Sequence, residues 1–186
     1  MLNILKDELN SHINTYAKIN EEFLNDIYKA YEIISKALKN NNKLLIFGNG
    51  GSAADAQHFA AELSGRYKVE RKGLSAIALS TDTSALTAIA NDYGYEFVFS
   101  RQVQAIAKKG DILFGISTSG SSKNVLEAFK EGEKLACVNI MLSSNKATND
   151  KYFNIKAPSL DTPRIQEVHI FVIHSICHLL DLEFKV

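Results

Sequence analysis

Two side chains suited to acid–base chemistry lie close to a glycine-rich loop. His58 and Glu62 are four residues apart in a segment expected to be helical, so they share one face of that helix. The loop before them, residues 48–52 (Gly-Asn-Gly-Gly-Ser), follows an apolar run, and its glycines allow a sharp turn that leaves backbone N–H groups open. A small anionic substrate bound at the loop would therefore meet an imidazole and a carboxylate.

A second loop is rich in hydroxyl groups. Residues 115–125 read Gly-Ile-Ser-Thr-Ser-Gly-Ser-Ser-Lys-Asn-Val, an apolar run that enters a turn and then a helix. Hydroxyl donors, free N–H groups and the helix dipole together suit a phosphate. A simple turn with an N-cap is the alternative, but the position after a strand, as in the first loop, favours phosphate. Lysine and glycine spacing match neither a Walker A motif nor a dinucleotide fingerprint, so no nucleotide cofactor is expected.

Two further segments contain polar residues whose roles the pattern leaves open. Asn91 and Asp92 could simply end a helix with turn chemistry, or bind sugar hydroxyls. In the last helix, Gln166 and His174 are eight residues apart, about 80° around the helix and about 12 Å along it, so one chain would struggle to bring both to one atom. The other histidines of this helix, His169 and His178, are expected to be hydrogen-bonded core residues.

Composition narrows the class of protein. The 186 residues are 46% hydrophobic, with 21 basic and 21 acidic side chains, so neither a nucleic-acid partner nor a basic surface for one is expected. Two cysteines among apolar neighbours are no disulfide framework and favour a reducing cytoplasm. The first residues lack the order of a signal peptide, and no apolar run of the length of a membrane span is expected.

The periodicity predicts an α/β fold, a doubly wound five-stranded parallel sheet flanked by helices. Apolar residues at helical spacing predict a helical extension over residues 1–41, which precedes a core over 42–186, and the two form a single domain, 1–186. Polar loops are expected outside the carboxyl ends of the strands. The expected strands are Leu44–Phe47, Leu74–Leu79, Asp111–Ile116, Ala136–Leu142 and Tyr152–Ile155, and the expected helices of the core are Ser52–Ser64, Thr83–Asn91, Glu96–Lys108, Lys123–Leu135 and Arg164–Phe184.

Four motifs in order carry a family resemblance. They are residues 48–67, beginning Gly-Asn-Gly-Gly-Ser, residues 87–94 (Thr-Ala-Ile-Ala-Asn-Asp-Tyr-Gly), residues 115–122, and residues 164–169 (Arg-Ile-Gln-Glu-Val-His) with His174. Together they resemble the sugar isomerase (SIS) family and, within it, the phosphoheptose isomerases, over nearly the whole chain. The resemblance implies conversion of sedoheptulose 7-phosphate into D-glycero-D-manno-heptose 7-phosphate through an enediol, the first step toward the heptose of surface glycans such as lipopolysaccharide.

The same resemblance assigns roles to residues. Glu62 and His174 would be the acid–base pair, and one zinc ion per subunit would be held by His58, Glu62, Gln166 and His174, although an amide oxygen is an uncommon zinc ligand. The family also implies a cytoplasmic homotetramer with active sites at subunit interfaces. Substrate would be bound by Asn49, Gly50, Gly51, Ser52, Glu62, Asn91, Asp92, Ser117, Thr118, Ser119, Ser122 and Gln166.

Three alternatives remain open. A non-catalytic relative that docks the replication initiator DnaA would lack the carboxylate at position 62 and the histidine at position 174, which this chain has. Another SIS isomerase, acting on a pentose or hexose phosphate, is not expected to join the glycine loop to His58 and Glu62. A purely structural helical assembly protein would leave three polar loops without a role.

Overall fold

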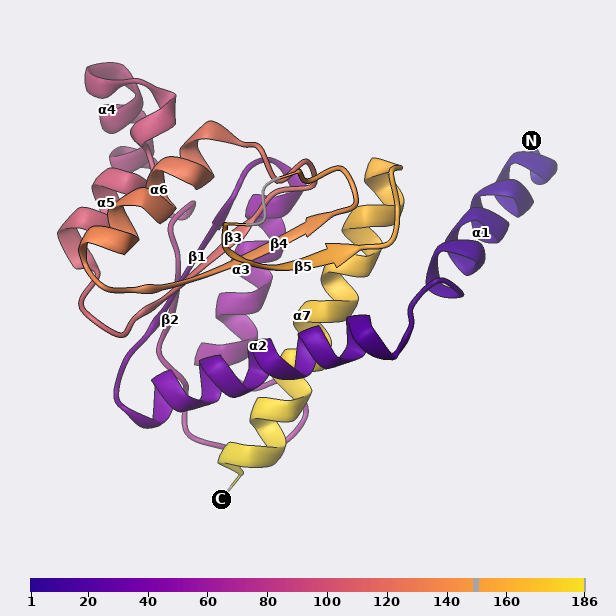
Figure 1. The fold of residues 1–186 in the computed structure, drawn as a ribbon, viewed down its shortest axis with the longest axis horizontal. Helices are drawn as coiled ribbons and strands as arrows, with labels where there is room; N and C mark the ends of the chain where they lie inside the picture. The colour runs from indigo at the N-terminus through magenta and orange to yellow at the C-terminus, as the bar shows by residue number, and fades with distance from the viewer. Residues whose placement is uncertain (149–150, 186) are drawn as a thin grey trace.

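Five parallel strands form the centre of the structure, a computed structural model that describes residues 1–148 and 151–185 (Figure 1). Their order in the sheet is β2-β1-β3-β4-β5, and every neighbouring pair runs parallel. This confirms the predicted fold class and all five predicted strands, with shifts of a few residues at their ends. The strands are β1 (Leu44–Gly48), β2 (Ala76–Ala78), β3 (Ile112–Ile116), β4 (Val138–Ser144) and β5 (Phe153–Ala157).

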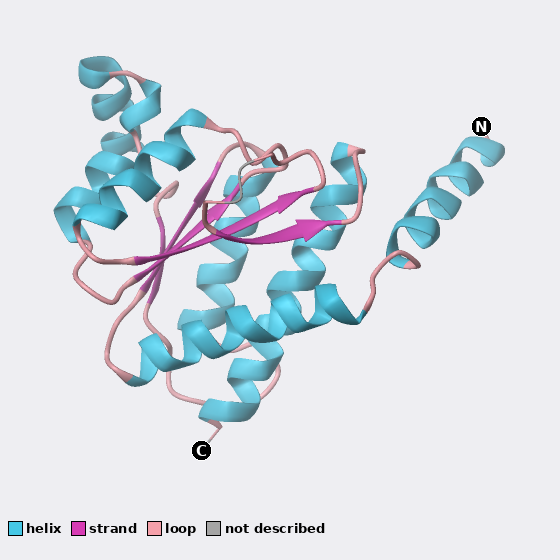
Figure 2. Ribbon diagram, in the orientation of Figure 1, coloured by secondary structure: helices cyan, strands magenta, loops and turns pink. Residues whose placement is uncertain are grey.

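Helices cover both faces of the sheet (Figure 2). The predicted helix over Glu96–Lys108 is wrong as a single element, because a short 3-10 turn, η1 (Tyr95–Phe97), precedes a seven-residue helix. The two helices expected before residue 40 are present. The helices are α1 (Leu2–Tyr16), α2 (Glu21–Lys39), α3 (Gly51–Ser64), α4 (Thr83–Tyr93), α5 (Ser100–Ile106), α6 (Lys123–Lys134) and α7 (Thr162–Phe184).

Alternating side chains of the buried strands build two separate cores. Ile46 of β1 and Phe114 of β3 point to one face, where α2, α3 and α7 pack. Leu45 and Phe47 of β1 point to the other, against α5 and α6. Strands buried on both faces read as continuous apolar runs, which is why the sequence pattern located them.

The strand order reverses between β1 and β3, because the chain moves outward from this pair in both directions. In doubly wound sheets, the loops at the carboxyl ends of such a pair enclose the ligand crevice. Here those loops are residues 48–52 after β1 and residues 117–122 after β3. The two loops that the sequence predicted to bind an anion therefore flank this reversal point.

Helix α1 projects from the body (Figure 1), and most of its apolar side chains are exposed. Most of its named contacts with α7 are polar: Arg164 donates to the backbone oxygen of Glu8 over 2.6 Å, and His12 Nδ1 lies 2.8 Å from the Glu167 carboxylate. At its last residue, the Tyr16 ring packs edge-on against Phe171. Leu2, Ile4, Leu5, Leu9 and Ile13 are each more than half exposed. A helix that turns its polar side inward leaves an apolar stripe that the single chain does not cover.

Helix α7 is the one helix in the described part of the chain that is long and apolar enough to cross a membrane. No apolar run of the length of a membrane span was expected from the sequence. Half of its most apolar window is buried within the fold, and Val168, Val172 and Ile176 are in the core shared with the sheet. Its composition is therefore accounted for by its position as the core helix, as expected from its apolar character on most sides.

Candidate active site

The two loops predicted to bind an anion are joined by a pair of side-chain amides. Asn49 Nδ2 donates to Asn124 Oδ1 over 2.9 Å, and Asn124 Nδ2 donates back to Asn49 Oδ1 over 2.8 Å. Asn124 is buried in the first turn of α6, directly after the hydroxyl-rich loop. This reciprocal pair fixes the orientation of the Asn49 amide and leaves it one N–H for another partner.

The segment after α4 reaches the same amide. Tyr95 donates its hydroxyl to Asn49 Oδ1 over 3.1 Å, from an otherwise exposed position in η1. Asn91 and Asp92 lie at the exposed end of α4, where the Asn91 amide donates to the Asp92 carboxylate over 2.9 Å. Asp82 caps α4 by accepting from Ala85 N.

Hydroxyl groups of the second loop face one another. Ser117 Oγ lies 2.9 Å from Ser122 Oγ and 3.4 Å from Ser119 Oγ. Ser122 occupies the N-cap position of α6, yet among the described residues its side chain makes no capping bond. The hydroxyls and the start of α6 therefore converge on one small volume, an arrangement that suits a phosphate.

In the single chain, the side chain of Gln166 packs against the glycine loop, residues 48–52. The amide nitrogen of Gln166 lies so close to Gly51 that a Cβ atom there would force the end of the Gln166 side chain to shift. Gly50 has φ of 56°, the left-handed region in which glycine is unstrained. Ser52 follows in the first turn of α3 and is buried.

His58, Glu62 and His174 come together about two turns farther along α3 and α7. His58 Nε2 lies 3.1 Å from Glu62 Oε1 and 3.3 Å from His174 Nε2. Tyr67 stacks on the His174 ring, with 5.2 Å between centroids and 28° between planes. Two ring nitrogens so close require a shared proton or a cation between them, because two lone pairs would repel.

Burial perturbs two titratable groups on these helices. Desolvation, followed by the charge of His58, lowers the pKa of His174 below its usual 6.5. Asp55, three residues before His58 on α3, has its pKa raised to about 6 by burial, which the charge of His58 opposes. Its Oδ2 atom is buried without a hydrogen-bond partner among the described residues. Shifts of this kind gather at functional sites.

The two contacts of His58, with Glu62 and with His174, are about as long as the separation between neighbouring ligand atoms of a zinc ion. Two ligands bound tetrahedrally at about 2.0–2.1 Å from zinc lie about 3.3 Å from each other. Both contacts of His58, at 3.1 and 3.3 Å, are close to that value. Within the described residues, however, no three His, Cys, Asp or Glu side chains are assembled as a metal site, and Gln166 lies about 12 Å along α7 from His174.

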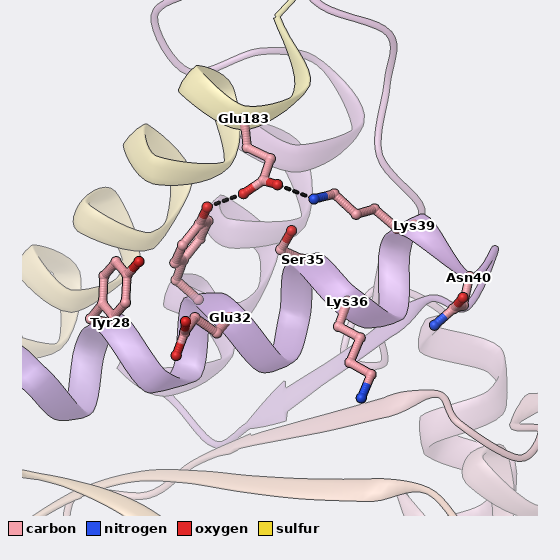
Figure 3. A pocket seen from close by; sticks show the side chains of 8 residues that line it. Tyr28, Glu32, Ser35, Lys36, Lys39, Asn40 and Glu183 are labelled. Carbon is pink, nitrogen blue, oxygen red and sulfur yellow. Dashed lines mark hydrogen bonds and ion pairs between the residues drawn. The ribbon is translucent and has the colours of Figure 1, made fainter.

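A hollow of about 380 Å³ opens beside His174, and Tyr16, Tyr67, Lys68 and His178 are among the residues that line it. A larger hollow of about 580 Å³ lies elsewhere, between α2 and the end of α7 (Figure 3). Its Glu183 carboxylate accepts from the Tyr31 hydroxyl and pairs with Lys39. These two contacts of Glu183 link α2 to the end of α7.

Comparison with known proteins identifies the family to which this architecture belongs. The SIS domain profile matches residues 9–144. The phosphoheptose isomerase of Aliarcobacter butzleri is 55% identical over 98% of this chain and 97% of its own length. The chain belongs to the phosphoheptose isomerase family. Two solved phosphoheptose isomerases, each aligned over 97% of this chain and 98% of its own, have the same fold: that from Neisseria gonorrhoeae (41% identity, TM-score 0.90) and that from Francisella tularensis (32%, 0.92).

The two other histidines of α7, His169 and His178, differ in burial. His169 is fully buried, its Nε2 lies 2.8 Å from the backbone oxygen of Ser143, and burial lowers its pKa to about 4. This confirms the expected core role. For His178 that expectation is wrong, because the residue is exposed and lies beside Tyr67, with 6.2 Å between the rings.

The sequence did not point to four side chains of the candidate site. They are Asp55, Tyr67, Tyr95 and Asn124. Asp55 had a signal, since it lies on the same helical face as His58, one turn earlier. For the others, the decisive contact comes from a residue far away in the sequence.

Proposed function

We propose that this protein is an aldose–ketose isomerase that converts sedoheptulose 7-phosphate into D-glycero-D-manno-heptose 7-phosphate. The observation that carries the proposal is the convergence of Glu62, His58 and His174 from two helices, next to the loops at the reversal point of the sheet. The identity of the substrate is inferred from the phosphoheptose isomerases to which the chain is similar. We also propose that the enzyme is cytoplasmic and that it supplies heptose for surface glycans.

The reaction moves hydrogen between neighbouring carbons. A base removes a proton from C1 of the ketose, the C1–H electrons form the C1=C2 double bond, and the C2 carbonyl oxygen takes a proton to give the enediol. The C1 hydroxyl then loses its proton to become the aldehyde oxygen, while the electrons of the double bond take up a proton at C2. Glu62 and His174 are the proposed pair. Burial lowers the pKa of His174, so the imidazole is neutral at pH 7 and has a lone pair that can accept a proton.

Substrate binding is assigned to the two loops. Ser117, Ser119 and Ser122 would hold the phosphate through their hydroxyls, with Thr118 and the start of α6, as the converging hydroxyl groups support. The N–H that the Asn124 pair leaves free on Asn49 would contact a sugar oxygen, beside Gly50, Gly51 and Ser52. Asn91, Asp92 and Gln166 complete the proposed set.

Zinc is part of the proposal. His58, Glu62 and His174 would hold the ion, and the two contacts of His58 support this, although the described residues of the single chain do not assemble the three side chains as a metal site. Bound zinc would polarise the sugar carbonyl and stabilise the enediolate oxygen. Gln166 would join this set only through a change of position or through another subunit. Elemental analysis of protein purified without chelator tests the assignment, because a metal-free enzyme with full activity would contradict it.

A homotetramer with sites at subunit interfaces is the proposed assembly. The outward apolar stripe of α1 supports it, since Leu2, Leu5 and Leu9 lack cover in the single chain. Light scattering after gel filtration should give four times the mass of the chain. The double variant Leu5→Lys, Leu9→Lys should lower that mass, and an unchanged tetramer would show that another surface holds the subunits together.

The decisive experiment on activity is a coupled assay with sedoheptulose 7-phosphate, with and without zinc. We expect Glu62→Gln and His174→Ala to lower turnover by at least about 100-fold while the substrate still binds. His178→Ala is the matched control, because it removes an exposed histidine one turn farther along the same helix. Near wild-type turnover in either site variant would refute the acid–base assignment.

Two further measurements separate the alternatives. A panel of five-, six- and seven-carbon sugar phosphates tests the substrate, and a preference for a shorter sugar would contradict the heptose assignment. A pull-down with DnaA tests docking to the replication initiator, which the presence of Glu62 and His174 argues against.

A further inference from the structure

A buried ion pair connects the ends of the two helices that supply the proposed acid–base residues. Arg71 Nε lies 2.7 Å from Asp181 Oδ1, and both side chains are fully buried although 110 residues separate them. Removing two charges from water is costly, so a pair of this kind persists only where further hydrogen bonds satisfy both groups. The remaining bonds of Arg71 and Asp181 show what the pair holds in place.

Arg71 satisfies the last backbone carbonyls of α3. Its guanidinium donates to the backbone oxygen of Glu62 over 2.8 Å, to that of Leu63 over 2.9 Å and to that of Gly65 over 3.2 Å. The final carbonyls of a helix have no partner within it, and Arg71 supplies one. The backbone of Glu62 itself is therefore fixed by this side chain.

Asp181 fixes the other side of the cluster. Its Oδ2 accepts from the backbone nitrogens of Lys68, over 2.5 Å, and Val69, over 2.8 Å. These residues directly follow Tyr67, whose ring stacks on His174. Asp181 is seven residues after His174, two turns along α7 and on the same side of the helix. One carboxylate thus holds both the helix of His174 and the aromatic ring that packs against it.

We propose that the Arg71–Asp181 pair sets the position of Glu62 relative to His174 and so acts as a positioning device for isomerisation. The proposal rests on the proposed function, in which these two residues exchange protons with the sugar. Neither Arg71 nor Asp181 touches the reacting atoms. A misplacement of about 1 Å between reacting groups can lower a rate by about 100-fold, so the pair has leverage on turnover beyond its effect on stability.

The chain provides a matched control pair at the amino ends of the strands, away from the loops of the candidate site. Asp111 is also fully buried, and it accepts from Lys43 Nζ over 2.5 Å and from the backbone nitrogen of Lys108 over 2.9 Å. Asp111 lies at the start of β3, away from the loops at the carboxyl ends. Asp111→Asn therefore makes the same chemical change, at the same burial, without touching the site.

The test compares Asp181→Asn with Asp111→Asn at temperatures equally far below the melting temperature of each variant. We expect Asp181→Asn to lower kcat by about 10- to 100-fold with KM within about twofold of the wild type, and Asp111→Asn to leave both within about twofold. Arg71→Lys, which keeps the charge but bonds fewer carbonyls, should give an intermediate kcat and serves if Asp181→Asn does not fold. Equal losses of kcat in the Asp181 and Asp111 variants would overturn the proposal.

Histidine NMR provides a readout that does not depend on catalysis. The ring signals of His174 in chelator-treated protein should move in Asp181→Asn and Arg71→Lys, because the stacked Tyr67 ring shifts, and should stay in place in Asp111→Asn. Unmoved signals in all three variants would refute positioning even if the wild type proved inactive on heptose phosphates. An active wild type with unaltered Asp181→Asn kinetics would refute positioning while the proposed function stood.

Discussion

Replacing Asn124 tests whether the amide pair at the loops controls substrate binding. Asn124→Ala removes two hydrogen bonds, of 2.9 and 2.8 Å, from a buried position. At about 1 kcal/mol each, the loss of unfolding free energy is about 2 kcal/mol. The Asn49 amide would then keep only the Tyr95 hydroxyl of its three described side-chain bonds and be less well oriented. Losing one oriented bond to the sugar, about 1.4 kcal/mol, corresponds to about a tenfold fall in kcat/KM.

Asn124→Asp should separate stability from binding. The carboxylate keeps an acceptor for Asn49 Nδ2 and adds negative charge in the first turn of α6, where the helix dipole favours it, so the stability loss should be smaller than for alanine. The same charge competes with the phosphate expected at this loop. KM should therefore rise more than in Asn124→Ala.

The assay combines thermal melts with steady-state kinetics on sedoheptulose 7-phosphate. Asn139→Ala in β4 is the control, since it removes one 2.9 Å bond from the Asn139 amide to the backbone oxygen of Phe129 in α6, away from both loops. It should lower the melting temperature and leave KM unchanged. A KM for Asn124→Asp at or below that of Asn124→Ala would refute the reasoning, because the added charge would then not face an anion.

Two further predictions concern titratable groups. Because the pKa of Asp55 is raised to about 6, above its ordinary 3.8, folding is favoured while the group is protonated and loses stability as pH rises through 6. Asp55→Asn should therefore stabilise the fold at pH 7.5 by about 1 kcal/mol, after discounting for the solvent around this half-buried carboxylate, and give no gain near pH 4; melts at both pH values check this. Because the pKa of His174 lies below 6.5, kcat/KM should stay flat down to that pH and fall only below it. An acidic limb centred above 6.5 in the pH profile would contradict the role of His174.

The sheet was predictable because its strands are buried on both faces. Leu44–Phe47 and Asp111–Ile116 read as continuous apolar runs and became β1 and β3 with little change at the ends. The strand expected over Leu74–Leu79 is shorter, since Leu74 N donates to Leu63 O of α3, outside the sheet. Whether Leu74 N donates to a neighbouring strand or to α3 depends on packing, and the periodicity of the sequence carries no information about packing.

The site was predictable where chemistry follows local spacing. His58 and Glu62 contact each other as their four-residue separation predicted, and the distance between Gln166 and His174 on one helix is as expected. Contacts between distant segments were not predictable. Asn124 and Tyr95 meet Asn49 only because the sheet brings their loops together, and nothing in their local sequence indicates it.

Helix α7 is the last element of the chain, yet it covers the centre of one sheet face. During synthesis, β1 to β5 can emerge before the 23 residues that bury Ile46 and Phe114 on that side have left the ribosome. An apolar surface of this kind is prone to aggregate until it is covered. The nascent chain therefore depends on its final segment both to become soluble and to acquire His174, so a ribosome that stops early releases neither a protected fold nor a working enzyme.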